Sequence, residues 1–204
     1  MEVTMAKCSK EHLILTAKKV ISEKGIAKAS LRQIATAAGV STGAIYHYYP
    51  NREALFYDIM SSSLSVTSQV ADDKHLDTTS REDICKEIHE NIVDRFSKVE
   101  ENRIQFFLLK EALQNNLDLK DNFVDKYEEW ISKTQKLIEH LYTEIDPQHE
   151  RAIASLLIGA IDGIALQLML NEDSVDVDAV GDIYKYLLDE GFSNILNYFN
   201  QVQV

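Results

Sequence analysis

Residues that interrupt helices are rare in this chain, which has 7 Gly and 2 Pro among its 204 residues. Pro removes a backbone hydrogen bond and Gly is conformationally loose, so their scarcity favours long uninterrupted helices. Hydrophobic residues make up 45% of the sequence and charged residues 26%, which are the proportions of a globular protein. We therefore expect a globular, all-α protein of about nine helices.

The cysteines and the apolar stretches indicate a cytoplasmic protein. Cys8 and Cys85 have no CxxC partner, so neither a disulfide framework nor a zinc site is indicated. The N-terminal residues lack the apolar core of a secretory signal. The longest apolar stretch is interrupted by Ser155, Asp162 and Gln167, so we expect no membrane partner.

Each helix predicted near the N-terminus begins or ends at a residue with capping chemistry. Polar side chains that accept a hydrogen bond from the first helical turn precede three of the helices, and glycines follow two of them. The polar capping residues are Ser30, Ser41 and Asn51, and the glycines are Gly25 and Gly39. Gln33 completes a capping-box pattern with Ser30. We expect helices at 11–24, from about 31 to 39, from about 42 to 49, and from about 52 onward.

The pattern changes beyond residue 60. Residues 61–80 are rich in serine and then in acidic residues, which predicts a loop and a boundary between two domains, 1–60 and 61–204. Periodic apolar residues then predict five more helices, and Asp146 followed by Pro147 is a typical helix start. These helices are expected at 81–99, 103–115, 119–142, 148–170 and 178–199.

Charge is distributed unevenly between the two expected domains. The chain carries a net charge of −12, but residues 1–59 hold eight Lys and Arg against five acidic residues, which leaves +3 there and −15 in the remainder. A basic segment in an acidic protein suits a partner made of phosphates, such as DNA, that meets only this segment. The alternative is an acidic solvated surface with a chance excess of basic residues at one end.

The segment S-L-R-Q-I-A-T-A-A-G-V-S-T-G-A-I-Y-H-Y-Y predicts a helix-turn-helix. Ala35, Val40 and Ile45 are spaced to pack two short helices together, and Gly39 allows the backbone to turn between them. Such a motif places its second helix in the major groove of DNA. The remaining surface of that helix is polar and aromatic.

Residues 14–60 resemble the DNA-binding domain of the TetR family. The resemblance rests on E-K-G at the end of the first helix and on the segment G-V-S-x-G-x-I-Y-x-Y-Y-P-x-R-E-A-L. It covers about a quarter of the chain. It implies an N-terminal three-helix helix-turn-helix domain followed by a larger C-terminal helical domain for ligand binding and dimerisation.

The resemblance also implies which residues contact DNA: Arg32, Thr42, Gly43, Ala44, Tyr46, His47, Tyr48 and Arg52. Arg52 occupies a position where the family usually has lysine, and its guanidinium can hold a phosphate with two hydrogen bonds. Tyr49 stands where the family usually has phenylalanine, so we expect it in the core. Tyr46 and Tyr48 have an alternative role, which is to cover that core.

Small residues form a strip on the helix expected at 148–170. Gly159 and Gly163 lie four residues apart on one helix face, and Ala152 and Ser155 extend the strip. Small side chains let another helix approach closely; the alternative is close packing within one subunit. The resemblance implies a homodimer formed by the last two long helices, which suits a palindromic operator in double-stranded DNA.

Aromatic residues are frequent between residues 81 and 142. The candidates for a small-molecule binding site are Phe106, Phe107, Phe123, Tyr127 and Trp130, together with the polar Asp162 and Gln167. Aromatic residues at helical spacing also form ordinary core, and the sequence does not separate the two roles. The resemblance implies a cavity for an unidentified small-molecule ligand in this region.

Patterns typical of catalysis are missing from the sequence. It has no glycine-rich phosphate loop and no G-x-S-x-G, and His89-Glu90 lacks the second histidine of a zinc-protease helix. Asp72, Asp73 and His75 are a weak candidate for a metal site within the predicted loop. We expect no enzymatic activity, no cofactor and no metal.

The sequence therefore predicts a transcription regulator, in particular a repressor that leaves a palindromic operator when a small molecule binds. Two alternatives stay open. One is an activator, or a regulator that answers to a protein partner. The other is a helical ligand carrier that has lost DNA binding.

Overall fold

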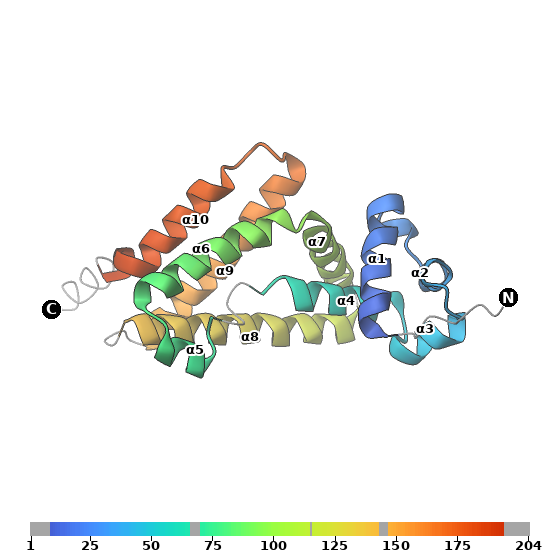
Figure 1. The fold of residues 1–204 in the computed structure, drawn as a ribbon, viewed down its shortest axis with the longest axis horizontal. Coiled ribbons are helices and arrows are strands. Elements are labelled where there is room, and N and C mark those ends of the chain that lie inside the picture. Colours follow the sequence, from blue (N-terminus) through green and yellow to red (C-terminus); the bar gives the residue numbers. More distant parts are fainter. Residues whose placement is uncertain (1–8, 66–69, 115, 143–146, 194–204) are drawn as a thin grey trace. The chain divides into compact units, whose positions relative to one another are not determined.

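The computed structural model describes residues 9–65, 70–114, 116–142 and 147–193. This part of the chain contains ten α-helices, a 3-10 turn at Ile26–Lys28 and a π-helix at Leu187–Gly191, and it has no strand. The prediction of an all-α protein is confirmed. The helices are α1 (Lys10–Lys24), α2 (Leu31–Ala38), α3 (Thr42–Tyr48), α4 (Arg52–Ser63), α5 (Asp73–Thr78), α6 (Arg81–Ser97), α7 (Val99–Leu113), α8 (Leu117–Leu141), α9 (Pro147–Leu170) and α10 (Val177–Tyr186) (Figure 1).

The additional helix, α5, lies in the segment that was expected to be a loop. Asp72 caps it, because its side chain accepts a hydrogen bond from the backbone N–H of His75 at 3.4 Å. Asp73 forms an ion pair with Lys136 at 2.5 Å, and the His75 ring nitrogen Nε2 lies 2.7 Å from a carboxylate oxygen of Glu87, within hydrogen-bond distance. The described residues contain no group of side chains that could hold a metal ion.

The last helix differs from the expected range of 178–199. α10 has regular α-helical hydrogen bonds as far as Tyr186, and the backbone then continues as the π-helix at Leu187–Gly191. The end of the expected helix, residues 194–199, lies outside the described residues.

Contacts divide the chain into two compact units. The N-terminal unit comprises Met1–Leu64 and Val99–Asp121, and the C-terminal unit comprises Ser65–Lys98 and Asn122–Val204. The chain therefore passes between the units three times, and α7 belongs with the N-terminal helices. The domain boundary after residue 60 stays a prediction, and no pattern in the sequence predicted that α7 would join α1 to α4.

The core of the N-terminal unit explains why α7 belongs to it. Leu13 in α1, Ile34 in α2 and Phe56 in α4 are fully buried. α7 packs against both α4 and α1, and Glu101 at its start pairs with Lys18 in α1 at 2.5 Å. Each large apolar side chain buried in this way contributes about 1.5–3 kcal/mol to folding.

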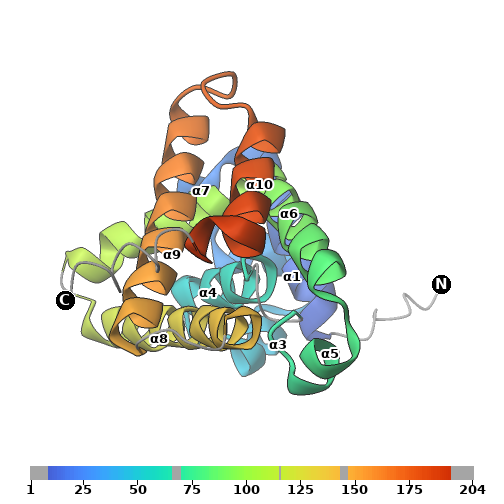
Figure 2. The same cartoon turned by 90° about the vertical axis from the view of Figure 1, so that its left-hand side faces the viewer.

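The C-terminal unit contains a very close approach between α6 and α10. A Cβ atom added to Gly181 in α10 would lie 2.6 Å from the His89 ring in α6, so any other residue would require that ring to move. On its other side α10 runs beside α9, as Figure 2 shows, and the Tyr184 hydroxyl donates a hydrogen bond to the Leu157 carbonyl at 2.7 Å.

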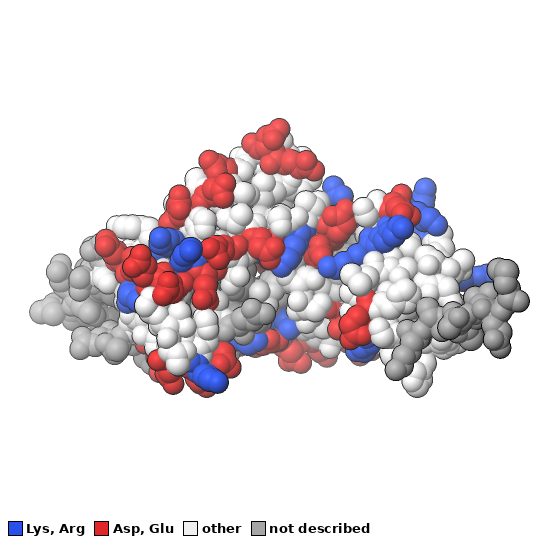
Figure 3. Space-filling model, in the orientation of Figure 1, with Lys and Arg blue, Asp and Glu red and all other residues white. Residues whose placement is uncertain are grey.

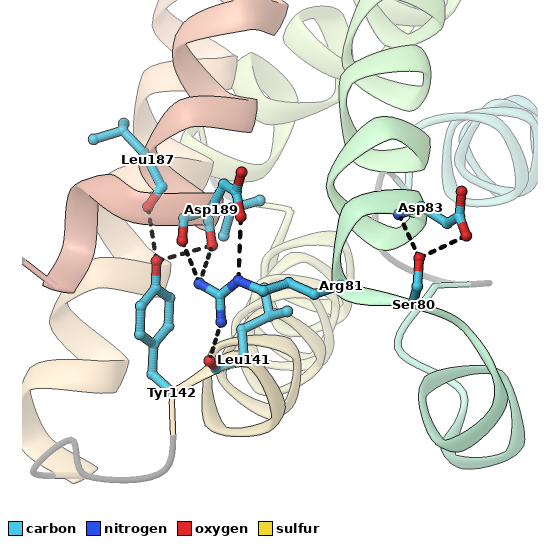
Figure 4. A network of polar contacts seen from close by, with 8 residues as sticks. Ser80, Arg81, Asp83, Leu141, Tyr142, Leu187 and Asp189 are labelled. Atoms are coloured by element: carbon cyan, nitrogen blue, oxygen red, sulfur yellow. Dashed lines mark hydrogen bonds and ion pairs between the residues drawn. The ribbon is translucent and has the colours of Figure 1, made fainter.

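Arg81, the first residue of α6, binds the ends of two other helices in this unit (Figure 4). Its guanidinium donates to the carbonyl oxygens of Leu141, at the end of α8, and of Leu188 and Asp189 in the π-helix. It also pairs with the Asp189 carboxylate at 3.3 Å and lies 4.7 Å from the centre of the Tyr142 ring. Unpaired carbonyl groups make the C-terminus of a helix negative, so this one cation compensates the carbonyl groups of both α8 and the π-helix. We call this group the Arg81 clamp.

Candidate functional sites

The turn between α2 and α3 has the geometry of a helix-turn-helix. Gly39 adopts φ 69° and ψ 26°, a left-handed conformation that favours glycine. The Val40 N–H then donates to the Ala35 carbonyl at 3.0 Å. Ala35 and Ile45 are buried between the two helices. The predicted capping box of Ser30 and Gln33 is confirmed.

The outer face of α3 is exposed. Thr42, Gly43 and His47 are exposed, Ala44 and Tyr48 are half-buried, and the Tyr46 side chain is 53% exposed. The exposure of Tyr46 argues against a role as a cover of the core. The opposite face holds Ile45, which is fully buried.

Tyr49, directly after α3, is in the core as predicted. Its side chain is 3% exposed and its hydroxyl donates a hydrogen bond to Asp58 at 2.7 Å. Burial, followed by this hydrogen bond and the charge of Asp58, raises the pKa of Tyr49 above the ordinary tyrosine value. The hydrogen bond fixes the end of α3 against α4.

Arg32 lies on an exposed, basic part of α2. Together with Lys24, Gln33 and Thr36 it lines a shallow hollow of about 320 Å³. No acidic residue lines this hollow, so two positive charges and two polar side chains face solvent there. Basic side chains also line part of α1 on the face seen in Figure 3.

Arg52, the first residue of α4, is more enclosed than the sequence suggested. Its guanidinium donates from Nε and Nη2 to Glu53, both at 3.2 Å, and from Nη1 to the Ala27 carbonyl at 3.5 Å. The guanidinium carbon lies 5.6 Å from the centre of the Phe56 ring and 5.1 Å from that of Phe107 in α7. Its side chain is 28% exposed.

The strip of small residues on α9 faces outward from its unit. Ala152, Ser155, Gly159 and Gly163 are all exposed. A Cβ atom added to Gly159 or Gly163 would meet nothing within 4 Å. Close packing within one subunit, the alternative use of these glycines, therefore does not occur among the described residues.

Large apolar side chains continue this exposed face onto both α9 and α10. Leu156, Leu170 and Ile183 are 73%, 80% and 58% exposed. Between the two helices lies an apolar groove of about 610 Å³, whose walls include Ala152, Leu156 and Ile183. By length and composition the segment His149–Leu170 could also cross a membrane, and 22% of its most apolar window is buried.

The predicted ligand residues divide between the two units. Phe106 and Phe107 lie on α7 and therefore in the N-terminal unit, where Phe107 contacts Phe56. Gln167 is exposed on α9. The remaining four lie in the C-terminal unit: Phe123, Tyr127, Trp130 and Asp162.

Three of these four residues, Tyr127, Trp130 and Asp162, form a cluster that also includes a buried arginine, Arg95, which was not among the predicted residues. The Tyr127 hydroxyl donates to the Asp162 carboxylate, and the Trp130 ring stands edge-on to the Tyr127 ring at 5.3 Å. Asp162 also pairs with Arg95 of α6 at 3.6 Å, and the Arg95 side chain is only 3% exposed. A sequence signal existed, because Arg95 follows Ile92 by three residues on the buried face of α6.

The C-terminal unit is acidic on its surface. Figure 3 shows acidic side chains over α6 and over the turn between α9 and α10. In that turn, Glu172, Asp173 and Asp176 are exposed. This distribution agrees with the negative charge expected for the C-terminal part of the chain.

A capped, glycine-turned helix pair with an exposed second helix defines a helix-turn-helix DNA-binding protein. Residues 13–59 match the family model described as "Bacterial regulatory proteins, tetR family". The chain is also similar to the HTH-type transcriptional regulator PksA of Bacillus subtilis, with 28% identity over 79% of each protein. Residues 13–59 therefore carry the DNA-binding domain of the TetR family of transcription regulators, which are DNA-binding proteins and not enzymes.

Solved structures share the fold along almost the whole chain. The fatty acid degradation regulator FadR from Bacillus halodurans has a TM-score of 0.67 at 20% identity, and the match covers 91% of this chain and 97% of that one. FadR from Bacillus subtilis, solved in complex with stearoyl-CoA, has a TM-score of 0.62 at 20% identity, and the match covers 90% of this chain and 99% of that one.

Proposed function

We propose that this regulator is a cytoplasmic repressor that binds a palindromic operator as a homodimer and leaves it when a small molecule binds the C-terminal unit. The observation that carries the proposal is the exposed outer face of α3 on a helix-turn-helix whose other face is buried. This outer face has no role in the core, but it has the size and polarity to enter a major groove.

The exposed residues divide into two kinds of DNA contact. Thr42 and Ala44 are short enough to approach base edges, where apolar groups meet thymine methyls. Arg32, His47 and the hydroxyls of Tyr46 and Tyr48 are suited to phosphates, which fix the register of the protein on DNA. Gly43 lets the α3 backbone come close, and Arg52 supplies a phosphate contact at the start of α4.

The exposed face of α9 and α10 supports the homodimer. A second copy would cover Leu156, Leu170 and Ile183 and fill the groove between the helices, while Gly159 and Gly163 allow close helix contact. Insertion into a membrane suits α9 less well, because Asp162 at its middle pairs with Arg95 and would lose that partner. A symmetric dimer presents two α3 helices to half-sites one helical turn apart, about 34–36 Å.

Tyr127, Trp130 and Asp162 support a ligand site in the C-terminal unit. The indole N–H of Trp130 is buried and has no hydrogen-bond acceptor among the described residues. An unpaired buried donor costs about 1–3 kcal/mol, which a carbonyl or ether oxygen of a ligand would recover. We therefore expect an apolar ligand that carries a hydrogen-bond acceptor. Phe123 would supply apolar contact, and Phe106, Phe107 and Gln167 stay predictions.

Trp130 provides a direct test of that site, because it is the only tryptophan in the chain. Stearoyl-CoA is a rational first probe, since a structural relative was solved with it. A saturable change in Trp130 fluorescence, over the same range of ligand concentration that releases DNA, would support the site. The affinity for the ligand measured in this way should be weaker in Tyr127→Phe. Release of DNA without any change in this fluorescence would place the ligand elsewhere.

Linkage explains how such a ligand would release DNA. A ligand that prefers a conformation in which the two α3 helices are wrongly spaced must weaken DNA binding by the same factor as DNA weakens ligand binding. If ligand binding leaves the distance between the two α3 helices unchanged, this mechanism is wrong.

The test of DNA recognition is the selection of genomic fragments by purified protein at about 0.15 M salt, where non-specific attraction is partly screened. Enrichment of a two-fold symmetric site supports the proposal, and Tyr46→Ala should abolish it. Leu15→Ala is the matched control, because Leu15 is 67% exposed on α1. A folded, dimeric protein that enriches no site would favour the ligand carrier. Reporter transcription in a deletion strain then separates a repressor from an activator.

A further inference from the structure

Arg52 has the geometry of a cation that is held in place by aromatic rings. Phe56 is fully buried, and its ring meets that of Phe107 edge-on, with 6.3 Å between the ring centres. The guanidinium of Arg52 lies over both rings, at 5.6 and 5.1 Å. Such cation–π contacts are attractive and are oriented by the faces of the rings. The two rings thus form a platform, one half from α4 and the other from α7.

The hydrogen bonds of Arg52 leave one edge of the guanidinium available. Nε and Nη2 each donate to Glu53, and Nη1 donates to the Ala27 carbonyl. A guanidinium has five N–H donors, so one on Nη1 and one on Nη2 have no acceptor among the described residues. An N–H group on each of two guanidinium nitrogens can donate hydrogen bonds to phosphate oxygens. The side chain is therefore pre-organised for an anion in the absence of one.

The helix that carries Phe107 is fixed to the same unit at a second point. Glu101, which is 8% exposed, pairs with Lys18 of α1 at 2.5 Å. Glu101 and Phe107 are separated by about 9 Å along α7, given a rise of about 1.5 Å per residue. α7 therefore contacts α1 through the Glu101–Lys18 ion pair and contacts Arg52 through the Phe107 ring.

We propose that Phe107 is a positioning residue for DNA binding: from α7 it holds the Arg52 guanidinium in the orientation that clamps an operator phosphate. The proposal rests on the proposed function and adds to it a point of regulation. Any rearrangement that withdraws α7 removes half of the platform under Arg52. The phosphate contact is then weakened without any change in α3, which recognises the bases.

The test is a double-mutant cycle of Phe107→Leu and Arg52→Gln, measured by titration of the selected operator duplex at several salt concentrations. Each lost phosphate contact lowers the salt slope by about 0.9, or about 1.8 for a dimer. We expect Phe107→Leu to weaken binding about 3- to 10-fold and to lower the salt slope in the same direction as Arg52→Gln. In the Arg52→Gln background, Phe107→Leu should have no further effect.

Matched variants separate positioning from a merely structural role. Phe107→Tyr keeps the ring face and should restore both the affinity and the slope. Leu113→Ala, at an 80% exposed position on the same helix, should change neither. An unchanged slope in Phe107→Leu, or an equal loss of affinity in both backgrounds, would overturn the proposal. Absence of operator binding by the unaltered protein would instead overturn the proposed function.

A second measurement applies if Phe107→Leu does not fold. The Arg52 Hε proton of the unaltered protein should show an upfield ring-current shift in NMR spectra of both the free protein and its complex with operator DNA. Loss of that shift in the complex would mean that Arg52 leaves the rings to reach DNA, which contradicts the proposal.

Discussion

Tyr46 and Tyr49 are three residues apart and have opposite surroundings. Tyr46 is 53% exposed, whereas Tyr49 is 3% exposed and bonded to Asp58. The same side chain therefore faces solvent at one position and the core at the other. The position of each residue relative to the buried Ile45 determines which role it takes.

Replacing Tyr49 with phenylalanine should lower the free energy of unfolding by about 1 kcal/mol near neutral pH, because the Asp58 hydrogen bond is lost. The pKa of Tyr49 is raised in the folded state, so its contribution is complete below the ordinary tyrosine pKa of about 10 and is lost as the pH rises above it. Urea denaturation at neutral and alkaline pH measures both effects. The difference between the two proteins should shrink at alkaline pH.

Tyr46→Phe is the control for this measurement. Its hydroxyl is on an exposed residue, so stability should stay within about 0.5 kcal/mol of the unaltered protein at both pH values. An equal loss of stability in the two variants would show that the Asp58 hydrogen bond is not the cause.

Residue-level predictions from the sequence succeeded where chemistry is local. The caps at Ser30, Ser41 and Asn51 depend on residues within one helical turn, and each is present. The enclosure of Arg52 by Phe107 could not be predicted in this way, because it depends on a helix almost fifty residues away in the chain. The buried Arg95 was missed because its partner, Asp162, lies on another helix.

At the scale of elements, the helical glycines have different surroundings. Gly181 in α10 faces the His89 ring, whereas Gly163 in α9 faces open space. One is required for packing within the chain, and the other leaves room for a partner. The periodicity of both helices could be read from the sequence, but the group that lies opposite each glycine could not.

Gly181→Ala should destabilise the protein by about 1–3 kcal/mol, because the new methyl group would overlap the His89 ring. The same substitution in a His89→Ala background should cost much less, since the overlap is removed. Thermal or urea denaturation of the four proteins measures this coupling. Equal costs in both backgrounds would show that the contact between α6 and α10 is not the reason for the glycine.

We expect the Arg81 clamp to stabilise the π-helix. Arg81→Gln removes the cation while the carbonyls of Leu141, Leu188 and Asp189 remain. Amide hydrogen exchange within Leu187–Gly191 should become at least about tenfold faster, which corresponds to about 1.4 kcal/mol. Exchange in α1 to α3 serves as the internal control and should not change. Unaltered exchange in the π-helix would show that it is stable without the clamp.

Two elements were not predicted, and both depend on tertiary contacts. α5 is only six residues long, and its Asp73 and His75 pair with α8 and α6. The π-helix follows α10 directly, and the apolar periodicity of the sequence continues through both as in a single α-helix. The carbonyl groups of the π-helix accept hydrogen bonds from Arg81 and Tyr142. Periodicity detects an apolar face, but it does not detect the partner of a carbonyl.

For the whole molecule, the fold class and the order of most helices could be predicted from the sequence, while the grouping of α7 with the N-terminal unit required the structure. The strip of small residues on α9 could be found from the sequence. Because the structure leaves this strip exposed, we expect it to form the dimer interface. A dimer is the unit that would bind a palindromic operator, so oligomeric state and DNA affinity should change together.

Gly159→Arg should therefore convert the protein into a folded monomer and weaken operator binding at least about tenfold, because one helix-turn-helix loses the contacts of the second half-site. Sedimentation velocity and operator titration measure the two effects. Ser132→Arg adds the same charge at an exposed site on α8 and is the matched control. A Gly159→Arg protein that stays dimeric would place the dimer interface elsewhere.

The discontinuity of the N-terminal unit has a consequence during biosynthesis. The ribosome makes α1 to α4 first, but α7, which holds Phe107 against Phe56, is complete only after residue 113. At about 5–20 residues per second the nascent chain waits roughly 2–10 s between these two events. During that interval the part of α4 that packs against α7 is uncovered, so we expect the nascent chain to recruit a chaperone at this stage. The N-terminal unit of this regulator is thus complete only after α7 has been translated.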